Sequence, residues 1–276
     1  MPPLLKNLGE KPLFMGILNV TPDSFSDAGR FFDPEAAVEH AIAMATAGAD
    51  IIDIGGVSSR PGAHDISVDE EIDRVMPVLK QVCQEIDVPV SIDTVNSEVA
   101  KLAILAGASI INDISALRVD EKIGQIAAKH KTYLILMHMR GTPRDMQNDT
   151  AYNDIIGEIS HFLGDAAKKA VGLGVSPDRI IIDPGIGFGK SVDGNFIILK
   201  NLHRFREIGY PLMVGVSRKS FIGKALGLKI DQRLEGSLAA ACYAFLNGAD
   251  IIRVHDVAET MRALAIVEKI TGASFA

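Results

Sequence analysis

The sequence predicts an α/β protein that folds as a single (β/α)8 TIM barrel. Short apolar runs rich in Ile, Val and Leu recur along the chain without polar alternation, which is typical of parallel strands buried on both faces. Segments with apolar residues at three- and four-residue spacing lie between most of these runs, as in amphipathic helices. Eight strand–helix units in about 250 residues is the usual size of such a barrel.

Each expected element follows from one of these two patterns. Strands are expected at 13–19, 49–56, 88–94, 108–115, 132–139, 179–189, 211–220 and 249–256. Helices are expected at 34–47, 68–86, 96–106, 153–173, 193–207, 231–247 and 256–271. Asp33, Ser67 and Asp256 are suitable N-caps directly before three of the helices. Glycines stand where three helices should end, at Gly48, Gly107 and Gly248.

The first turn argues against a doubly wound sheet, which is the main alternative. That fold usually has a Gly-rich first turn, whereas the turn here, "NVTPDS" (19–24), contains no glycine. We therefore expect one domain over 1–276, with an N-terminal extension over 1–12.

Composition excludes several classes of protein. The formal net charge is −7 and no basic run occurs, so a nucleic-acid partner is not expected. The two cysteines, Cys83 and Cys242, lie in apolar helical patterns and suggest reduced residues of a cytoplasmic protein. The N-terminus does not have the pattern of a signal peptide, and no apolar stretch has the length of a membrane span.

Polar residues follow the expected strands, at the end where a barrel builds its active site. They are Asn19, Asp53, Ser58, Ser59, Arg60, Asp93, Thr94, Asn112, Asp113, His138, Asp183, Ser217, Arg218, Lys219, Arg253 and His255. A lone polar residue at a strand end is more often a cap or a loop anchor, and that interpretation stays open for Asp53, Asp113 and His138.

Two groups of these side chains suit two kinds of ligand. Asp93, Asn112 and Asp183 are mainly hydrogen-bond acceptors, which suit a flat, NH-rich heterocycle. A second group of side chains suits an anion such as phosphate, because arginine presents a planar fork to phosphate oxygens. This second group comprises Asn19, Arg60, Arg253 and His255.

The glycine-rich segment "PGIGFGKS" (184–191) is not a known nucleotide-binding motif. Pro184 occupies the place of the first glycine of a P-loop, and Lys190 that of the third glycine of a dinucleotide-binding turn. We expect its glycines to let the backbone approach a flat ligand, with Phe188 as one wall. Zinc-ligand spacing and a G-x-S-x-G nucleophile motif are also absent from the sequence.

Eight motifs together resemble dihydropteroate synthase, in the same order and over nearly the whole chain. They are "GILNVTPDSFSD", "DIGGVSSRPG", "SIDT", "IINDIS", "HMRGTPRDMQ", "DPGIGFGK", "GVSRKSFIG" and "RVHDV". The second departs from the "GGESTRPG" of many members, because Val57 replaces an acid and Ser59 replaces a threonine.

The resemblance implies a transferase of folate and tetrahydrofolate biosynthesis. It would condense 6-hydroxymethyl-7,8-dihydropterin pyrophosphate with p-aminobenzoate by a dissociative step, with Mg2+ as cofactor and pyrophosphate as leaving group. Sulfonamides would compete with p-aminobenzoate, and the enzyme would be a homodimer formed through its late helices. Two alternatives stay open: a methyltetrahydrofolate-dependent corrinoid methyltransferase, and a non-catalytic pterin-binding homologue.

The resemblance also implies a role for individual residues. The pterin set is Asp93, Asn112, Ile114, Met137, Asp183, Phe188, Gly215 and Lys219. The pyrophosphate set is Asn19, Ser59, Arg60, Arg253 and His255, with Asn19 as metal ligand. The p-aminobenzoate set is Phe25, Pro61, Phe188, Lys219 and Ser220. The catalytic residues are Asp27, Lys219 and Arg253, and the loops at about 20–33 and 57–67 are expected to be mobile. Met137 is nearly as well explained as barrel core. A structural histidine is the alternative for His255, but its place two residues after Arg253 puts both side chains on one strand face and favours the functional role.

Overall fold

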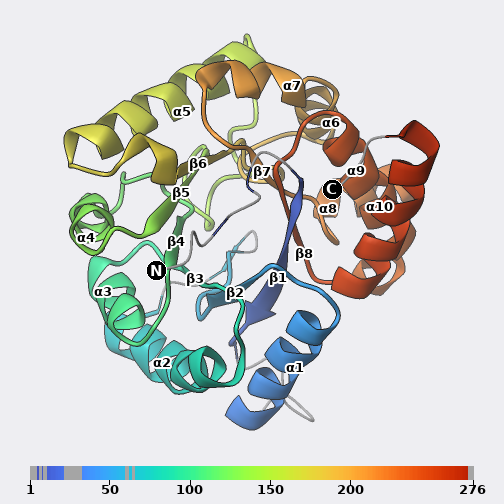
Figure 1. Cartoon of the computed structure of the whole chain (residues 1–276). Helices are drawn as coiled ribbons and strands as arrows, with labels where there is room; N and C mark the ends of the chain where they lie inside the picture. Colours follow the sequence, from blue (N-terminus) through green and yellow to red (C-terminus); the bar gives the residue numbers. More distant parts are fainter. Residues whose placement is uncertain are drawn as a thin grey trace.

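Eight parallel strands form one sheet that closes into a barrel (Figure 1). The computed structural model describes residues 5, 8, 11–21, 33–59, 62–63 and 66–272. The strand order is β6-β5-β4-β3-β2-β1-β8-β7, and a bridge between Ile182 and Leu212 joins the two ends. The strands are β1 (Leu13–Asn19), β2 (Ile51–Gly55), β3 (Val90–Asp93), β4 (Ile110–Asp113), β5 (Tyr133–Met137), β6 (Ile180–Asp183), β7 (Met213–Gly215) and β8 (Ile251–Val254). The predicted TIM barrel is confirmed.

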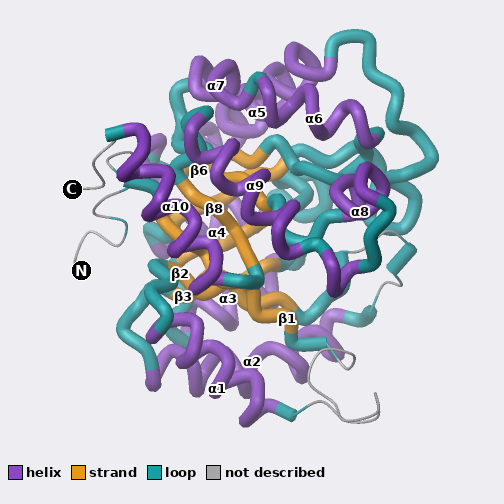
Figure 2. The backbone as a smooth tube through the Cα atoms, turned by 90° about the vertical axis from the view of Figure 1, so that its right-hand side faces the viewer, coloured by secondary structure: helices purple, strands orange, loops and turns teal. Residues whose placement is uncertain are grey.

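Helices surround the barrel on the outside (Figures 1 and 2). They are α1 (Pro34–Thr46), α2 (Val68–Glu85), α3 (Ser97–Leu105), α4 (Lys122–His130), α5 (Ile155–Gly172), α6 (Val192–Lys200), α7 (Leu202–Phe205), α8 (Ser220–Leu226), α9 (Leu234–Leu246) and α10 (Val257–Thr271). Within the described ranges, none of them is both long and apolar enough to cross a membrane.

All three predicted N-cap residues stand at the N-cap position, and two of them cap the helix through their side chains. The Asp33 side chain accepts hydrogen bonds from the backbone at the start of α1, and Ser67 does the same for α2. Asp256 is the N-cap residue of α10, as predicted, but its side chain makes no capping hydrogen bond. Its carboxylate instead accepts from the Arg218 side chain, with 3.0 Å between Nε and Oδ2. A charged partner distant in sequence thus takes the oxygens that a cap would use.

One expected helix is divided in the structure, and two helices occur that were not expected from the sequence. The helix expected at 193–207 is divided between α6 and α7 at Asn201, whose side-chain amide donates to the Ile197 carbonyl. The helices α4 and α8 were not predicted. Each contains a glycine where another side chain packs closely. A Cβ at Gly124 would lie 2.6 Å from Leu173, and one at Gly223 would lie 2.4 Å from Arg233.

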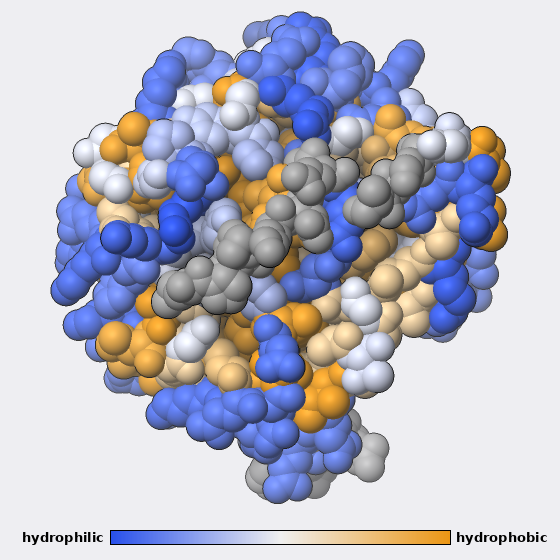
Figure 3. All heavy atoms as spheres, in the orientation of Figure 1, coloured by the Kyte–Doolittle hydropathy of each residue, from blue (hydrophilic) through white to orange (hydrophobic). Residues whose placement is uncertain are grey.

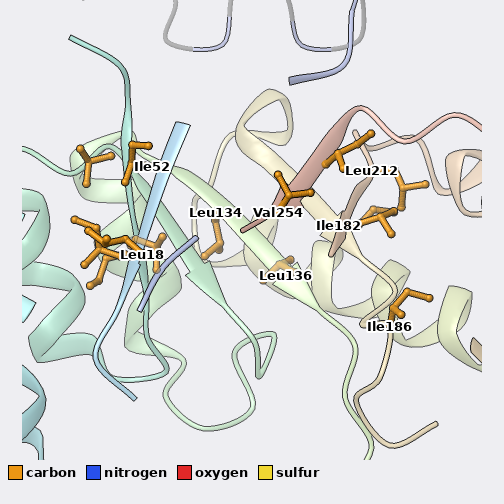
Figure 4. Close-up of a cluster of buried hydrophobic side chains, with 14 of the residues drawn as sticks. Leu18, Ile52, Leu134, Leu136, Ile182, Ile186, Leu212 and Val254 are labelled. Carbon is orange, nitrogen blue, oxygen red and sulfur yellow. The ribbon is translucent and has the colours of Figure 1, made fainter. Parts of the chain in front are cut away.

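Apolar side chains fill both faces of the sheet. The larger cluster lies between strands and helices and includes Leu18, Ile52 and Leu136 (Figure 4). The smaller cluster fills the barrel interior at the amino ends of the strands. It comprises Leu5, Leu13, Met15, Ile51, Ile110, Ile135, Ile181, Met213 and Ile251. The barrel interior is therefore a packed core at the amino ends of the strands. It leaves room for a site only toward their carboxyl ends.

The expected extension and two loops fall partly outside the described residues. Of these regions, the structure leaves out residues 1–4, 6–7, 9–10, 22–32, 60–61 and 64–65. The predicted mobility of the two loops therefore stays a prediction.

Candidate functional site

The barrel interior changes from apolar to polar within two residues on each even-numbered strand. The same short pattern, two isoleucines and then a polar residue, ends at Asp53, Asn112, Asp183 and Arg253. Because side chains two residues apart share a face, these four lie directly above the isoleucines that fill the barrel. Local strand periodicity thus places four polar groups at one level.

One pocket at this level collects the predicted pterin residues. It encloses about 330 Å3 of empty space, part of it open to solvent. Its lining comprises Ser59, Asp93, Asn112, Ile114, Met137, Asp183, Ile186, Phe188, Met213, Gly215, Lys219 and Arg253. All eight residues predicted for the pterin are in this set. Ser59 and Arg253, predicted to bind pyrophosphate, share the pocket with them.

Asp183, Phe188 and Lys219 form one wall of the pocket. Asp183 Oδ1 accepts from the Gly185 amide at 2.7 Å, and burial raises the pKa of the carboxyl group. The Lys219 ammonium lies 4.1 Å from the centre of the Phe188 ring, which is a cation–π distance. Burial lowers the pKa of Lys219 to about 8. A cation, an acceptor and a flat ring therefore meet on this side.

Arg253, which also lines the pocket, lies between two aspartates. Its Nε donates to Asp53 Oδ2 at 2.7 Å and its Nη2 donates to Asp93 Oδ2 at 2.9 Å. Burial raises the pKa of Asp93 to about 7, Arg253 lowers it, and the charges of Asp53 and Glu71 raise it further. Two carboxylates thus share one guanidinium here, and burial is the main reason that the pKa of Asp93 lies above its ordinary value.

The glycine-rich segment after β6 approaches protein backbone. A Cβ at Gly185 would lie 1.9 Å from the His138 carbonyl oxygen, and one at Gly189 would lie 2.6 Å from that of Arg140. Both glycines also have positive φ angles, 69° and 67°. The close approach expected of these glycines is thus made to the chain that follows β5. Phe188 is among the residues that line the pocket, and its contact with a flat ligand stays a prediction.

Several predicted residues do not line this pocket. The His255 ring lies with Nδ1 3.0 Å from Ser217 Oγ. Burial, followed by the charge of Arg253, lowers its pKa to about 3, so the imidazole is neutral at pH 7. Asn19 ends β1 and pairs in register with Gly55. Ser220 lines a second pocket, together with Lys190 and Lys224. Phe25, Asp27, Arg60 and Pro61 lie outside the described residues.

Asp113 and His138 have structural roles, as the alternative interpretation allowed. Asp113 accepts from the backbone amides of Ser115 and Leu117 and anchors the turn after β4. His138 packs edge-on against Phe162, with ring centres 4.8 Å apart. Its Nδ1 lies 2.9 Å from the buried Lys190 Nζ, which also donates to the Phe188 carbonyl at 2.8 Å. Lys190 thus ties the Phe188 loop to the end of β5.

Asp53 and Lys190 are the residues that the sequence interpretation missed. Asp53 was left open as a cap, but its side chain is fully buried and contacts Arg253. The repeated pattern on the even strands could have identified it, since Asp53 has the same place as Asn112, Asp183 and Arg253. No local signal distinguishes Lys190 from an exposed loop lysine.

The protein ligand expected for Mg2+ is the side-chain oxygen of Asn19, at the end of β1. Asn19 is half-buried at the end of β1, and its register partner Gly55 pairs in turn with Asp93. Among the described residues there is no group of three or more His, Cys, Asp or Glu side chains that could hold a metal. A single amide oxygen suits Mg2+, which is often bound through one or two protein ligands and substrate phosphates.

The chain is similar to known proteins over almost its full length. A sequence model of the family described as pterin binding enzyme matches residues 15–255. Dihydropteroate synthase from Synechocystis sp. is 48% identical over 250 residues, which is 90% of this chain and 86% of the relative. The Xanthomonas albilineans enzyme with 4-aminobenzoic acid has a TM-score of 0.90 at 42% identity, covering 96% of this chain and 95% of that one. The Yersinia pestis enzyme in complex with a sulfonamide drug has a TM-score of 0.91 at 43% identity, covering 96% of both chains.

Proposed function

This chain belongs to the family of pterin-binding enzymes, as a dihydropteroate synthase. We propose which residues at the mouth of its barrel bind each substrate and which take part in the reaction. The reaction condenses 6-hydroxymethyl-7,8-dihydropterin pyrophosphate with p-aminobenzoate and releases pyrophosphate, in folate biosynthesis. The alternatives, a corrinoid methyltransferase and a non-catalytic homologue, are not favoured, because the matched relatives are dihydropteroate synthases.

The pterin ring would occupy the pocket at the level of the polar layer. The observation that carries this assignment is that Asp93, Asn112, Asp183, Lys219 and Arg253 line one pocket. Asp183 has one oxygen on the Gly185 amide, and the other would accept from the amino group and ring N–H of a pterin. Lys219 would donate to the ring carbonyl or N5. Ile114, Met137, Phe188 and Gly215 would contact the faces of the ring.

The diphosphate would lie beside the pterin, near the ends of β1 and β8. We assign it to Asn19, Ser59, Arg60, Arg253 and His255. Arg253 contributes a charged planar donor, and the neutral His255 contributes one N–H. Bound Mg2+ would neutralise charge on the leaving diphosphate, and Asn19 is the protein residue suited to hold it. The presence of Ser59 instead of threonine keeps a hydroxyl donor for the same contact.

p-Aminobenzoate would enter from the side of α8. Phe188 and Lys219 border the pterin pocket, while Ser220 borders the neighbouring one, so an amine between them would reach the pterin methylene. Phe25 and Pro61 would complete this second site. The first bond to break would be the C–O bond to diphosphate, leaving a cation on the methylene. The Asp27 carboxylate would stabilise that cation until the nitrogen of the aromatic amine attacks it, forms the C–N bond and releases one proton.

Asp27→Asn is expected to lower kcat roughly 100-fold, because the amide cannot stabilise the developing cation. Affinity for the pterin substrate should change less than threefold. Single-turnover rates and calorimetric binding separate the two effects. Near-normal turnover by the variant would remove Asp27 from the mechanism.

The proposed activity is tested by product formation from the two substrates with Mg2+. We expect 7,8-dihydropteroate and pyrophosphate in equal amounts, and loss of turnover when a chelator removes the metal. A sulfonamide should inhibit competitively with p-aminobenzoate. Competition with the pterin substrate alone would contradict our placement of the amine site, and absence of product would contradict the function itself.

We also propose a homodimer and a cytoplasmic location. The late helices carry exposed apolar side chains at Tyr243, Leu246 and Ile266, which are 44%, 53% and 58% exposed. Hydrophobic residues are visible on the right of the molecule in Figure 3, where Figure 1 places α10. Within the segment 236–247, Ala241 and Ala244 face the core, so only its outer face would serve. The two free thiols suit a reducing compartment.

A further inference from the structure

We propose that Asp53 is a positioning residue that fixes the orientation of both Arg253 and Asn112 in the pterin pocket. The proposal rests on the function proposed above, because it concerns how that pocket recognises its ligand. Asp53 is not among the residues that line the pocket. It acts on the ligand only through its two partners.

One carboxylate oxygen of Asp53 serves both partners. Oδ2 accepts from Arg253 Nε at 2.7 Å and from Asn112 Nδ2 at 3.0 Å. Arg253 lies on β8 and Asn112 on β4, and each of these strands is two places away from β2 in the sheet order. Asp53 therefore joins three strands across the barrel interior. An ordinary loop anchor, such as Asp113, bonds only to its own turn.

Asp53 determines which end of the Asn112 amide is offered to a ligand. A carboxylate can only accept hydrogen bonds, so Asn112 must turn its NH2 group toward Asp53. Asn112 Oδ1 is then left buried, and it has no partner within the described part of the chain. Since Asn112 lines the pocket, its free oxygen is an acceptor for a ligand N–H. A buried acceptor without a partner is costly, which favours an NH-bearing ligand at this place.

Asp53 also fixes the plane of the Arg253 guanidinium. Nε is bound to Asp53 and Nη2 to Asp93, so two anchors on two different strands define the position of the group. Arg253 Nη1 has no hydrogen-bond acceptor within the ranges the structure describes. Its donors are therefore available for an anionic ligand at a fixed place. Hydrogen bonds to a charged acceptor are about twice as strong as neutral ones, so the negative charge of Asp53 matters for both partners.

Asp53→Asn tests the proposal, because it keeps the shape and one acceptor oxygen but removes the charge. We expect binding of 6-hydroxymethylpterin to weaken about tenfold, with kcat/KM for the pterin substrate falling at least as much. The side-chain Nε–H signal of Arg253 in a 15N–1H spectrum of the free enzyme should shift or exchange faster with solvent. The matched control is Asp113→Asn, a second buried aspartate, which should leave that signal and pterin affinity unchanged.

Two results would overturn the proposal: an unchanged Arg253 Nε–H signal in a folded Asp53→Asn variant, or pterin affinity within twofold of the parent. If the variant does not fold, solvent exchange of the Arg253 Nε–H in the parent enzyme decides, and rapid exchange would contradict the anchor. This signal is measured without ligand. The signal therefore tests the role of Asp53 even if the parent enzyme makes no product. Absence of product would contradict the proposed function and not the role of Asp53.

Discussion

Asp183→Asn is expected to weaken binding of 6-hydroxymethylpterin roughly 100-fold or more. The carboxylate is 4% exposed and one of its oxygens is held by the Gly185 amide at 2.7 Å. In the variant, the amide oxygen can keep that bond, but the NH2 group then faces the donors of the ligand. Two donors in contact inside a buried pocket lose both the hydrogen bond and the charge that strengthened it. Titration calorimetry at pH 7 measures the loss.

Asp113→Asn is again a useful control for this measurement. It is a buried aspartate that bonds to its own turn, so it should affect thermal stability and leave pterin affinity unchanged. A far-UV circular dichroism spectrum like that of the parent shows that Asp183→Asn is folded. Affinity within threefold of the parent value in a folded variant would move the pterin ring to a different place.

Lys219→Met is expected to lower kcat/KM roughly 100-fold, because it removes the cation that lies against the Phe188 ring in the pocket. Lys219 should act as an ammonium. Burial lowers its pKa to about 8, so the charged form is lost as the pH rises through about 8. We therefore expect kcat/KM of the parent to decrease above that pH, since this parameter reports ionisations of the free enzyme.

Lys219→Arg is the matched variant for the pH dependence. A guanidinium stays charged throughout the accessible range, so the decrease near pH 8 should disappear even if the absolute rate is lower. Rates between pH 6 and 10, with both substrates varied, make the comparison. A decrease near pH 8 that persists in both Lys219 variants would assign it to another group.

Much of the fold could be predicted because its signals are local. The strand expected at 13–19 matches β1, and the starts of α1 and α2 follow from Asp33 and Ser67. The helices that were not predicted contain residues that are unfavourable in a helix. In α4 and α8, glycines weaken the helical pattern, and they are needed for side chains that pack from elsewhere in the chain.

The sequence predicted which residues meet at the candidate site, but it did not predict which of them bond to one another. Polar residues at the strand ends predicted that Asp93, Asn112 and Asp183 would meet, and they line one pocket. The role of Asp53 stayed open because it depends on Arg253, which is 200 residues away. The side-chain partner of Asp256 was unpredictable for the same reason, since Arg218 lies 38 residues earlier.

The sequence by itself determined the barrel and the level at which its interior becomes polar. Both depend on strand periodicity, which every strand carries within its own few residues. Only the tertiary structure decided which polar groups pair across the interior and which atoms remain for a ligand. Closure of the sheet sets those distances, and the orientation of Asn112 and Arg253 follows from an acceptor on a strand that neither of them adjoins.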